Sequence, residues 1–138
     1  MIAPQLSSSP SRNELGWLVL RLALSGLIAV HGWTRWLTGG VPIFGEWLTS
    51  QGLPFGYAIA ASVTGIEILG TVLLATGKIV APLTLTFAAI YSVGIYMVHA
   101  QEGWFVVGKG RNGVEYSVLL IVALLCLGLQ HLPRKTAN

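Results

Sequence analysis

Four long apolar segments dominate this chain and limit what it can fold into. They cover residues 17–36, 57–76, 80–98 and 113–130. Each is close to the ~20 residues that an α-helix needs to cross ~30 Å of hydrocarbon. Open strands would leave unpaired backbone groups in lipid, and the alternation of a membrane β-barrel is absent. The segments therefore predict an all-α protein, a four-helix bundle that spans a membrane four times.

The composition supports a membrane environment. Of 138 residues, 54% are hydrophobic and only 9% are charged, whereas about a quarter of a soluble domain is charged. The basic residues are scattered rather than gathered in a stripe with aromatics, so nucleic-acid binding is not indicated. We divide the chain into a polar tail (1–14), one membrane domain (15–130) and a short basic tail (131–138).

The charges in the loops indicate an orientation. Four crossings put both termini on one side, with Arg12, Lys78, Arg134 and Lys135, and leave Arg35, Lys109 and Arg111 on the other. The positive-inside rule favours cytoplasmic termini by this small excess. The segment 38–55, rich in Gly, Pro and aromatics, is expected to be a loop at the membrane interface. Residues 100–112 are expected to form a second long loop.

Ionisable residues inside the apolar segments are the main functional signal. Glu67 lies at the middle of the second segment. A carboxylate at the bilayer centre costs about 2.5–3.5 kcal/mol even on permissive scales. Glu67 must therefore be neutral, paired or hydrated, and we expect it to face the bundle interior. Arg21 and His31 lie on the first segment. Counted from its end at Trp36, Arg21 lies deeper in the membrane than Glu67, and His31 lies less deep.

The remaining ionisable residues cluster in depth. His31 and Arg35 lie one helical turn apart on one face, His99 closes the third segment and Glu115 opens the fourth. With cytoplasmic termini, all four fall in the outer half of the bundle. We expect them to form a polar pocket there, covered by the two longer loops.

Structural roles remain open for each of these residues. Arg21 and Arg35 can extend toward lipid headgroups along their alkyl chains. Glu67 can be part of a packing salt bridge, and His99 and Glu115 can be ordinary interfacial residues or caps.

No established metal, phosphate or nucleophile motif is present. No HxxxH, HExxH or CxxC spacing supports a metal site, although two histidines and a glutamate are usable ligands. The single cysteine, Cys126, excludes an intrachain dithiol centre. We expect no bound metal.

Several segments, taken in order, resemble the DoxX family. They are LRLALSGLIAVHGWTRW, GIEILGTVLLATG, YMVHAQEGWF and GVEYSVLLIVALL, which together cover about residues 15–130. The resemblance implies a small four-helix protein of the bacterial inner membrane. It also implies a link to quinone-dependent sulfur oxidation or to oxidative-stress complexes. Positions that match the family pattern are Arg21, His31, Gly32, Arg35, Glu67, His99, Glu115 and Tyr116. The family often has Lys where this chain has Arg35.

The leading hypothesis is a membrane subunit of a quinone-linked redox system. His31 or His99 would hydrogen-bond a quinone oxygen, and Glu67 or Glu115 would relay protons. Arg21, Arg35, Glu115 and Tyr116 are the further candidates for ligand binding. No haem, flavin or iron–sulfur ligand set is evident, so electrons would come from a partner enzyme or from the substrate.

Two other functions remain open. One is a non-catalytic scaffold that anchors soluble redox enzymes to the membrane. The other is a small proton-coupled transporter that uses Glu67. The lack of an interrupted helix pair or an internal repeat argues against the transporter.

Overall fold

The computed structural model describes residues 11–133, and all regular structure in this range is helical. Residues 1–10 and 134–138, which include most of the two predicted tails, lie outside the described residues. The elements in chain order are α1 (Arg12–Leu37), α2 (Gly40–Ser50), α3 (Gly56–Gly65), the π-helical turn η1 (Ile66–Gly70), α4 (Thr71–Ala75), α5 (Val80–Met97), the 3₁₀ turn η2 (His99–Glu102) and α6 (Glu115–Gln130).

The helix α1 begins at Arg12 rather than at the first apolar residue. Ser11 is its N-cap and forms a capping box with Glu14. The Glu14 backbone N–H donates to Ser11 Oγ at 3.2 Å, and the Ser11 backbone N–H donates to Glu14 Oε2 at 2.7 Å. This exchange satisfies backbone donors that the first turn leaves free. Hydropathy alone misses the polar first turn.

Three helical rods are long and apolar enough to cross a membrane. They are Arg12–Leu37, Gly56–Ala75 and Val80–Met97. The fourth apolar helix, α6, has 16 residues and spans roughly 24 Å at ~1.5 Å per residue, less than the ~30 Å of a typical hydrocarbon core. All four rods expose large apolar side chains, for example Val30, Leu69, Leu85 and Leu119. Lipid is the solvent that suits such a surface.

The sequence predicted one uninterrupted α-helix for the second rod, but the structure shows an interruption. The π-helical turn η1 separates α3 from α4, and Glu67 lies in it. The Thr71 hydroxyl donates to the carbonyl oxygens of Glu67 (2.6 Å) and Ile68 (3.0 Å), which supports backbone groups at this turn. Such π-turns carry an extra residue and occur often at functional sites.

The connection between the first two rods was predicted to be a loop, but the structure differs. Most of it forms the helix α2, which packs closely on the start of α3. Gly45 and Gly56 lie at the contact, and a Cβ added to Gly45 would come within 2.7 Å of the Tyr57 Cα. A spacing of that kind requires glycine. Val41, Leu48 and Ala60 form a small apolar core between the two helices.

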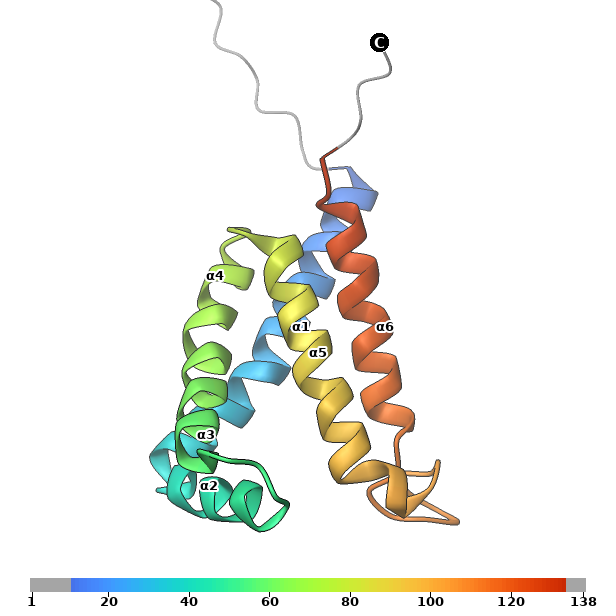
Figure 1. Cartoon of the computed structure of the whole chain (residues 1–138). Helices are drawn as coiled ribbons and strands as arrows, with labels where there is room; N and C mark the ends of the chain where they lie inside the picture. The colour runs from blue at the N-terminus through green and yellow to red at the C-terminus, as the bar shows by residue number, and fades with distance from the viewer. Residues whose placement is uncertain (1–10, 134–138) are drawn as a thin grey trace, which may run out of the picture.

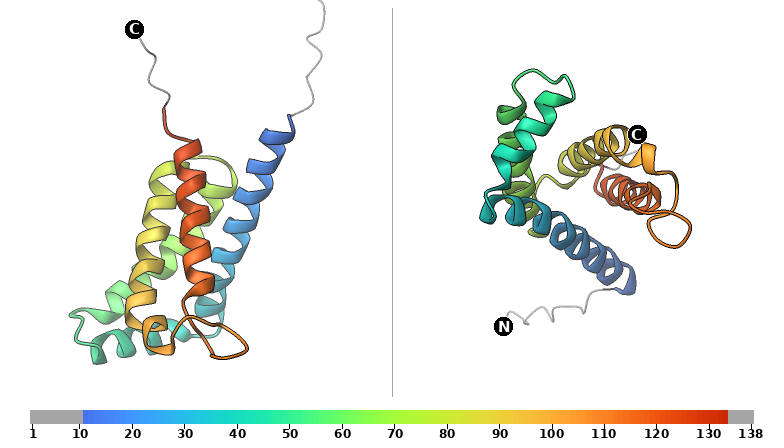
Figure 2. Two further views of the ribbon diagram at one scale, coloured as in Figure 1. Left: turned by 90° about the vertical axis from the view of Figure 1, so that its right-hand side faces the viewer. Right: turned by 90° about the horizontal axis from the view of Figure 1, so that it is seen from below.

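The four rods form two pairs, α1 with the rod of α3, η1 and α4, and α5 with α6. Figure 1 shows α3 and α4 as one rod beside α1, and α5 antiparallel to α6. The main core joins α1, α4, α5 and α6 through Leu24, Ile28, Leu74, Phe87, Leu124 and Leu127. The start of α1, the end of α6 and the turn between α4 and α5 lie at one end, called here the terminal end (Figure 2). The opposite end, called the α2 end, carries α2, η2 and residues 103–114.

Candidate functional site

A cavity of about 440 Å³ lies toward the α2 end, between the α1–α3 side and α5. We call it the chamber. Its polar lining consists of His31, Arg35, Glu67, Tyr91 and His99. The other lining residues are apolar or aromatic, and they include Phe44, Trp47, Leu48 and Leu53 from α2 and the residues after it. The predicted polar pocket is thus a largely apolar chamber with a few polar groups, and α2 rather than two loops forms its cover.

The centre of the chamber wall is a salt bridge between α1 and η1. Arg35 Nη1 lies 2.6 Å from Glu67 Oε2, and the Glu67 side chain is only 3% exposed. The prediction that Glu67 faces the bundle interior is confirmed. Burying one charge without a partner is costly, so the pair is held together by the low dielectric around it.

Two neighbours fix the geometry of this pair. Arg35 Nη1 also donates to Thr64 Oγ1 at 3.1 Å, while the Thr64 hydroxyl donates to the Ala60 carbonyl at 2.7 Å. Gly32 on α1 faces the Glu67 Cβ, and a Cβ built on Gly32 would come within 2.8 Å of it. Glycine at this position lets η1 approach α1 closely enough for the charges to meet.

The guanidinium of Arg35 also lies against an aromatic face from α2. Its Cζ is 4.6 Å from the centroid of the Phe44 ring, a cation–π contact. The Phe44 ring is stacked with that of Trp47, at 6.1 Å between centroids and an interplanar angle of 15°. Within residues 11–133, Nη1 carries the hydrogen bonds of this guanidinium. The Nε and Nη2 protons therefore remain for a ligand.

Tyr91 and His31 extend the polar groups along the chamber. The Tyr91 hydroxyl donates to Glu67 Oε1 over a long 3.4 Å. The His31 ring lies edge-on to the Tyr91 ring, with centroids 6.1 Å apart and an interplanar angle of 68°. The carboxylate, phenol and imidazole thus follow one another on the same wall.

His99 is oriented by the loop that follows it. Its Nδ1 lies 2.7 Å from the Asn112 carbonyl oxygen. A carbonyl only accepts hydrogen bonds, so Nδ1 carries a proton and donates it. In the neutral ring, Nε2 is then left as an acceptor.

The structure brings together four of the predicted site residues and leaves three elsewhere. His31, Arg35, Glu67 and His99 line the chamber. Glu115 instead accepts a hydrogen bond from the Val106 backbone N–H at 2.9 Å and holds the loop before α6. Tyr116 is half exposed on α6. The expectation that Glu115 joins this pocket is wrong, because its carboxylate is directed to the loop backbone.

Arg21 lies toward the terminal end, away from the chamber. Its guanidinium is next to the tight turn at Gly77, where a Cβ would come within 2.6 Å of Nη1. It borders a shallow cavity with Trp17, Gln130 and His131. Arg21 therefore does not reach Glu67, although the long side chain would allow it from depth alone.

Several residues in or beside the chamber were missed by sequence reasoning. Tyr91 and Thr64 have apolar neighbours in sequence and carry no charge, so they gave no signal of their own. Phe44 and Trp47 lie in the segment expected to be an interfacial loop. Their spacing of three residues would have suggested one helix face.

Among residues 11–133, no three His, Cys, Asp or Glu side chains lie close enough to hold a metal ion together.

The family comparison fits this architecture. The sequence model of the family described as DoxX matches residues 16–100, more than half of the chain. The chain belongs to the DoxX family. It is a multi-pass membrane protein, as the family and the long apolar helices both indicate. The matched range includes every polar chamber residue, from His31 to His99, and ends before Glu115 and Tyr116. Searches of the curated proteins and of the solved structures found no match.

Proposed function

We propose that this DoxX protein is the membrane subunit of a quinone-linked redox system and that its chamber binds the quinone headgroup. The observation that carries the proposal is the Arg35–Glu67 pair with Tyr91, set in a wall that is otherwise apolar and aromatic. A quinone ring is apolar and has two carbonyl acceptors at opposite edges. A site for it needs a few fixed donors in an apolar surround.

The chamber offers suitable donors and proton carriers. The free N–H groups of Arg35 suit a carbonyl oxygen that gains negative charge on reduction. The Phe44–Trp47 stack offers an aromatic face for the ring. Reduction of a quinone takes two electrons and two protons and gives a quinol. In this proposal a reduced soluble partner protein supplies the electrons, while Glu67, His31 and His99 supply or pass the protons.

The topology that we propose has four crossings, with cytoplasmic termini in a bacterial inner membrane. The two described chain ends lie near each other at the terminal end (Figure 1), which supports an even number of crossings. The short helix α6 exposes Leu119, Val122 and Leu129 to the surroundings, and local bilayer thinning accommodates a short span at modest cost. The chamber then lies in the outer half.

Labelling from outside the cell tests this orientation. A cysteine at Arg111, in a Cys126→Ser background, should react with a membrane-impermeant maleimide in intact spheroplasts. A cysteine at Lys78, at the opposite end, should react only after lysis. The reverse pattern would contradict cytoplasmic termini.

Quinone retained through purification tests the function. The protein is purified in native lipid discs, and extracted quinones are identified by mass. His31→Ala should lose at least about four-fifths of the bound quinone, since one missing hydrogen bond to a desolvated group costs about 1 kcal/mol or more. His131→Ala is the matched control, because His131 borders the terminal-end cavity and bonds the Leu127 carbonyl. It should retain the wild-type amount.

Other outcomes decide against this function. Equal quinone content in both histidine variants, at the level of the bulk membrane, would remove the quinone site. Co-purification of a soluble redox enzyme whose activity survives Glu67→Gln would favour a scaffold. Proton-coupled flux in liposomes that stops in Glu67→Gln, without quinone binding, would favour a transporter.

A further inference from the structure

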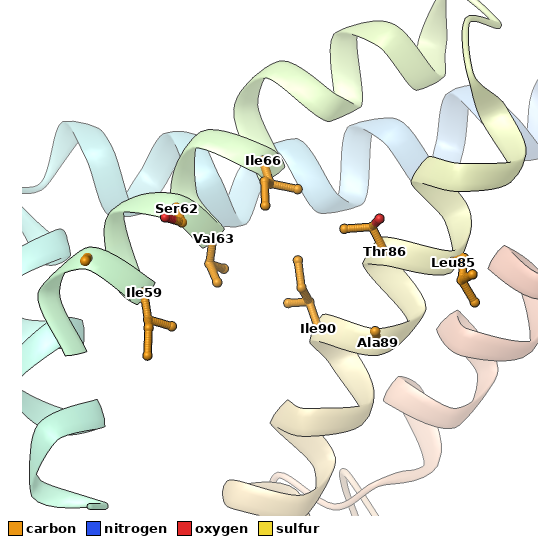
Figure 3. A pocket seen from close by; sticks show the side chains of 9 residues that line it. Ile59, Ser62, Val63, Ile66, Leu85, Thr86, Ala89 and Ile90 are labelled. Carbon is orange, nitrogen blue, oxygen red and sulfur yellow. The ribbon is translucent and has the colours of Figure 1, made fainter. Parts of the chain in front are cut away.

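A second cavity, the groove, runs along the outside of the bundle between α3 with η1 on one side and α5 on the other. Figure 3 shows Val63 and Ile66 across from Ile90 and Thr86. Its volume is about 570 Å³. The lining residues are Ala58, Ile59, Ser62, Val63, Ile66, Leu85, Thr86, Ala89 and Ile90. From Ala58 to Ile66 the helical rise is roughly 12 Å.

The groove exists because α3 and α5 pack on different partners. The helix α3 packs on α2 and α1, and α5 packs mainly on α6. The two rods diverge toward the α2 end, as Figure 1 shows. Small side chains at Ala58, Ser62 and Ala89 leave the space between them unfilled.

The groove and the chamber adjoin each other between α3 and α5. Ile59, Val63, Ala89 and Ile90 line both cavities. The charged side chains of Arg35 and Glu67 lie on the chamber side. The groove has only two polar side chains, and the Thr86 hydroxyl already donates to the Pro82 carbonyl at 3.0 Å. The two cavities together therefore suit one molecule with a polar head and a long apolar chain.

We propose that the groove holds the part of an apolar tail nearest the headgroup, in a molecule whose headgroup lies at Arg35 and Glu67. This rests on the proposed function and narrows its ligand to a long-tailed isoprenoid quinone. Such a molecule reaches the site from within the bilayer. Lipid chains are as apolar as the groove, so the tail gains little from leaving lipid, and its affinity comes from close packing along Ile59, Ile66 and Ile90.

Filling the groove tests the proposal without touching the chamber. Thr86 is exposed and lines only the groove, so Thr86→Phe should occupy the tail position. Ser92 is the matched control on the same helix. It is exposed too, it lines neither cavity, and its hydroxyl also bonds the carbonyl four residues earlier, that of Ala88. Binding is measured in lipid discs with ubiquinone-10 and with a tail-less ubiquinone, as mole fractions in the membrane.

We expect Thr86→Phe to weaken binding only of the quinone that has a tail. Thr86→Phe should weaken ubiquinone-10 binding about fivefold, because the tail loses its packed contacts. It should leave tail-less quinone binding unchanged, and Ser92→Phe should change neither. Wild-type affinity should be higher for the tailed quinone.

Four results would overturn the tail position. Unchanged ubiquinone-10 binding in Thr86→Phe would contradict the tail position but not the headgroup site. Equal weakening of both quinones would show that the change acts on the chamber instead. Failure of both quinones to bind the wild-type protein would remove the proposed function and the tail with it. Efficient disulfide cross-linking of Thr86→Cys between copies, in a Cys126→Ser background, would show that a second chain fills the groove.

Discussion

Two arginines on one helix have opposite surroundings. Arg35, near the α2 end of α1, pairs with the buried Glu67, bonds Thr64 and lies over Phe44. Arg21, near the terminal end, forms no salt bridge within residues 11–133, and its buried Nε has no hydrogen-bond partner there. Both residues interrupt the same apolar segment.

The difference shows that a charged residue within the membrane forms a binding site only where the fold places partner groups around it. Around Arg35, three features coincide: Gly32 allows close approach, η1 places Glu67 there, and α2 supplies an aromatic face. At Arg21 the chain offers only the Gly77 turn. A long cation near a helix end can extend to headgroups at little cost.

The largest expected effect is that of removing the paired arginine. Arg35→Met leaves Glu67 buried without its partner, which should destabilise the protein by about 3–5 kcal/mol. Arg21→Met should cost less than about 1 kcal/mol, since no ion pair is broken. Thermal unfolding in lipid discs compares the two. Similar losses of stability would erase the distinction between the two arginines.

The next effect concerns the close approach at Gly32. A Cβ there would collide with the Glu67 Cβ, so Gly32→Ala should cost about 1–3 kcal/mol and weaken quinone binding. Gly26→Ala on the same helix meets no atom within 4 Å. It should be neutral or stabilise by up to about 1 kcal/mol. If both variants are equally stable and bind quinone normally, α1 does not need glycine beside Glu67.

A smaller effect is expected at the π-turn. Thr71 is buried, and Thr71→Val removes the hydroxyl that bonds the Glu67 and Ile68 carbonyls. We expect a loss of about 1 kcal/mol. Thr86→Val, at an exposed position with a similar hydroxyl bond, should change stability by less than about 0.5 kcal/mol. Equal, negligible shifts in unfolding temperature would remove Thr71 from the support of η1.

The smallest effect is expected at Tyr91. Its hydrogen bond to Glu67 is long, at 3.4 Å, so Tyr91→Phe should cost less than about 1 kcal/mol. A bound quinone should still be retained, with affinity reduced by no more than about fivefold. A loss as large as that of Arg35→Met would mean that Tyr91, and not the ion pair, is the main anchor of the headgroup.

The sequence predicted much of this fold because hydrophobic length is a simple signal. The ends of three rods lie within two residues of their predicted places, at Gly56–Ala75, Val80–Met97 and Glu115–Gln130. The start of α1 was missed because Ser11 and Glu14 extend it by capping rather than by hydropathy. The helix α2 was missed because its Gly and Pro residues usually end helices, whereas here they start one or allow close packing.

The site was predicted in part for a related reason. The cost of burying Glu67 identified it from sequence, and the depths of His31 and Arg35 put them near it. The π-turn left no pattern in the sequence, and it decides where Glu67 is directed. Glu115 was assigned by depth to the same pocket. Depth does not determine the direction in which a side chain leaves the helix axis. The Glu115 carboxylate accepts a hydrogen bond from the Val106 backbone N–H instead.

Quinone binding by variants of the two arginines tests the central claim most directly. A tail-less ubiquinone is titrated into lipid discs that hold the wild-type protein, Arg35→Lys, Arg35→Met or Arg21→Met, with folding checked by circular dichroism. The account predicts that Arg35→Met weakens binding at least about tenfold, that Arg35→Lys recovers part of it, and that Arg21→Met stays within about twofold of the wild type. Equal affinity in all four proteins would contradict the assignment of the headgroup to the Arg35–Glu67 pair.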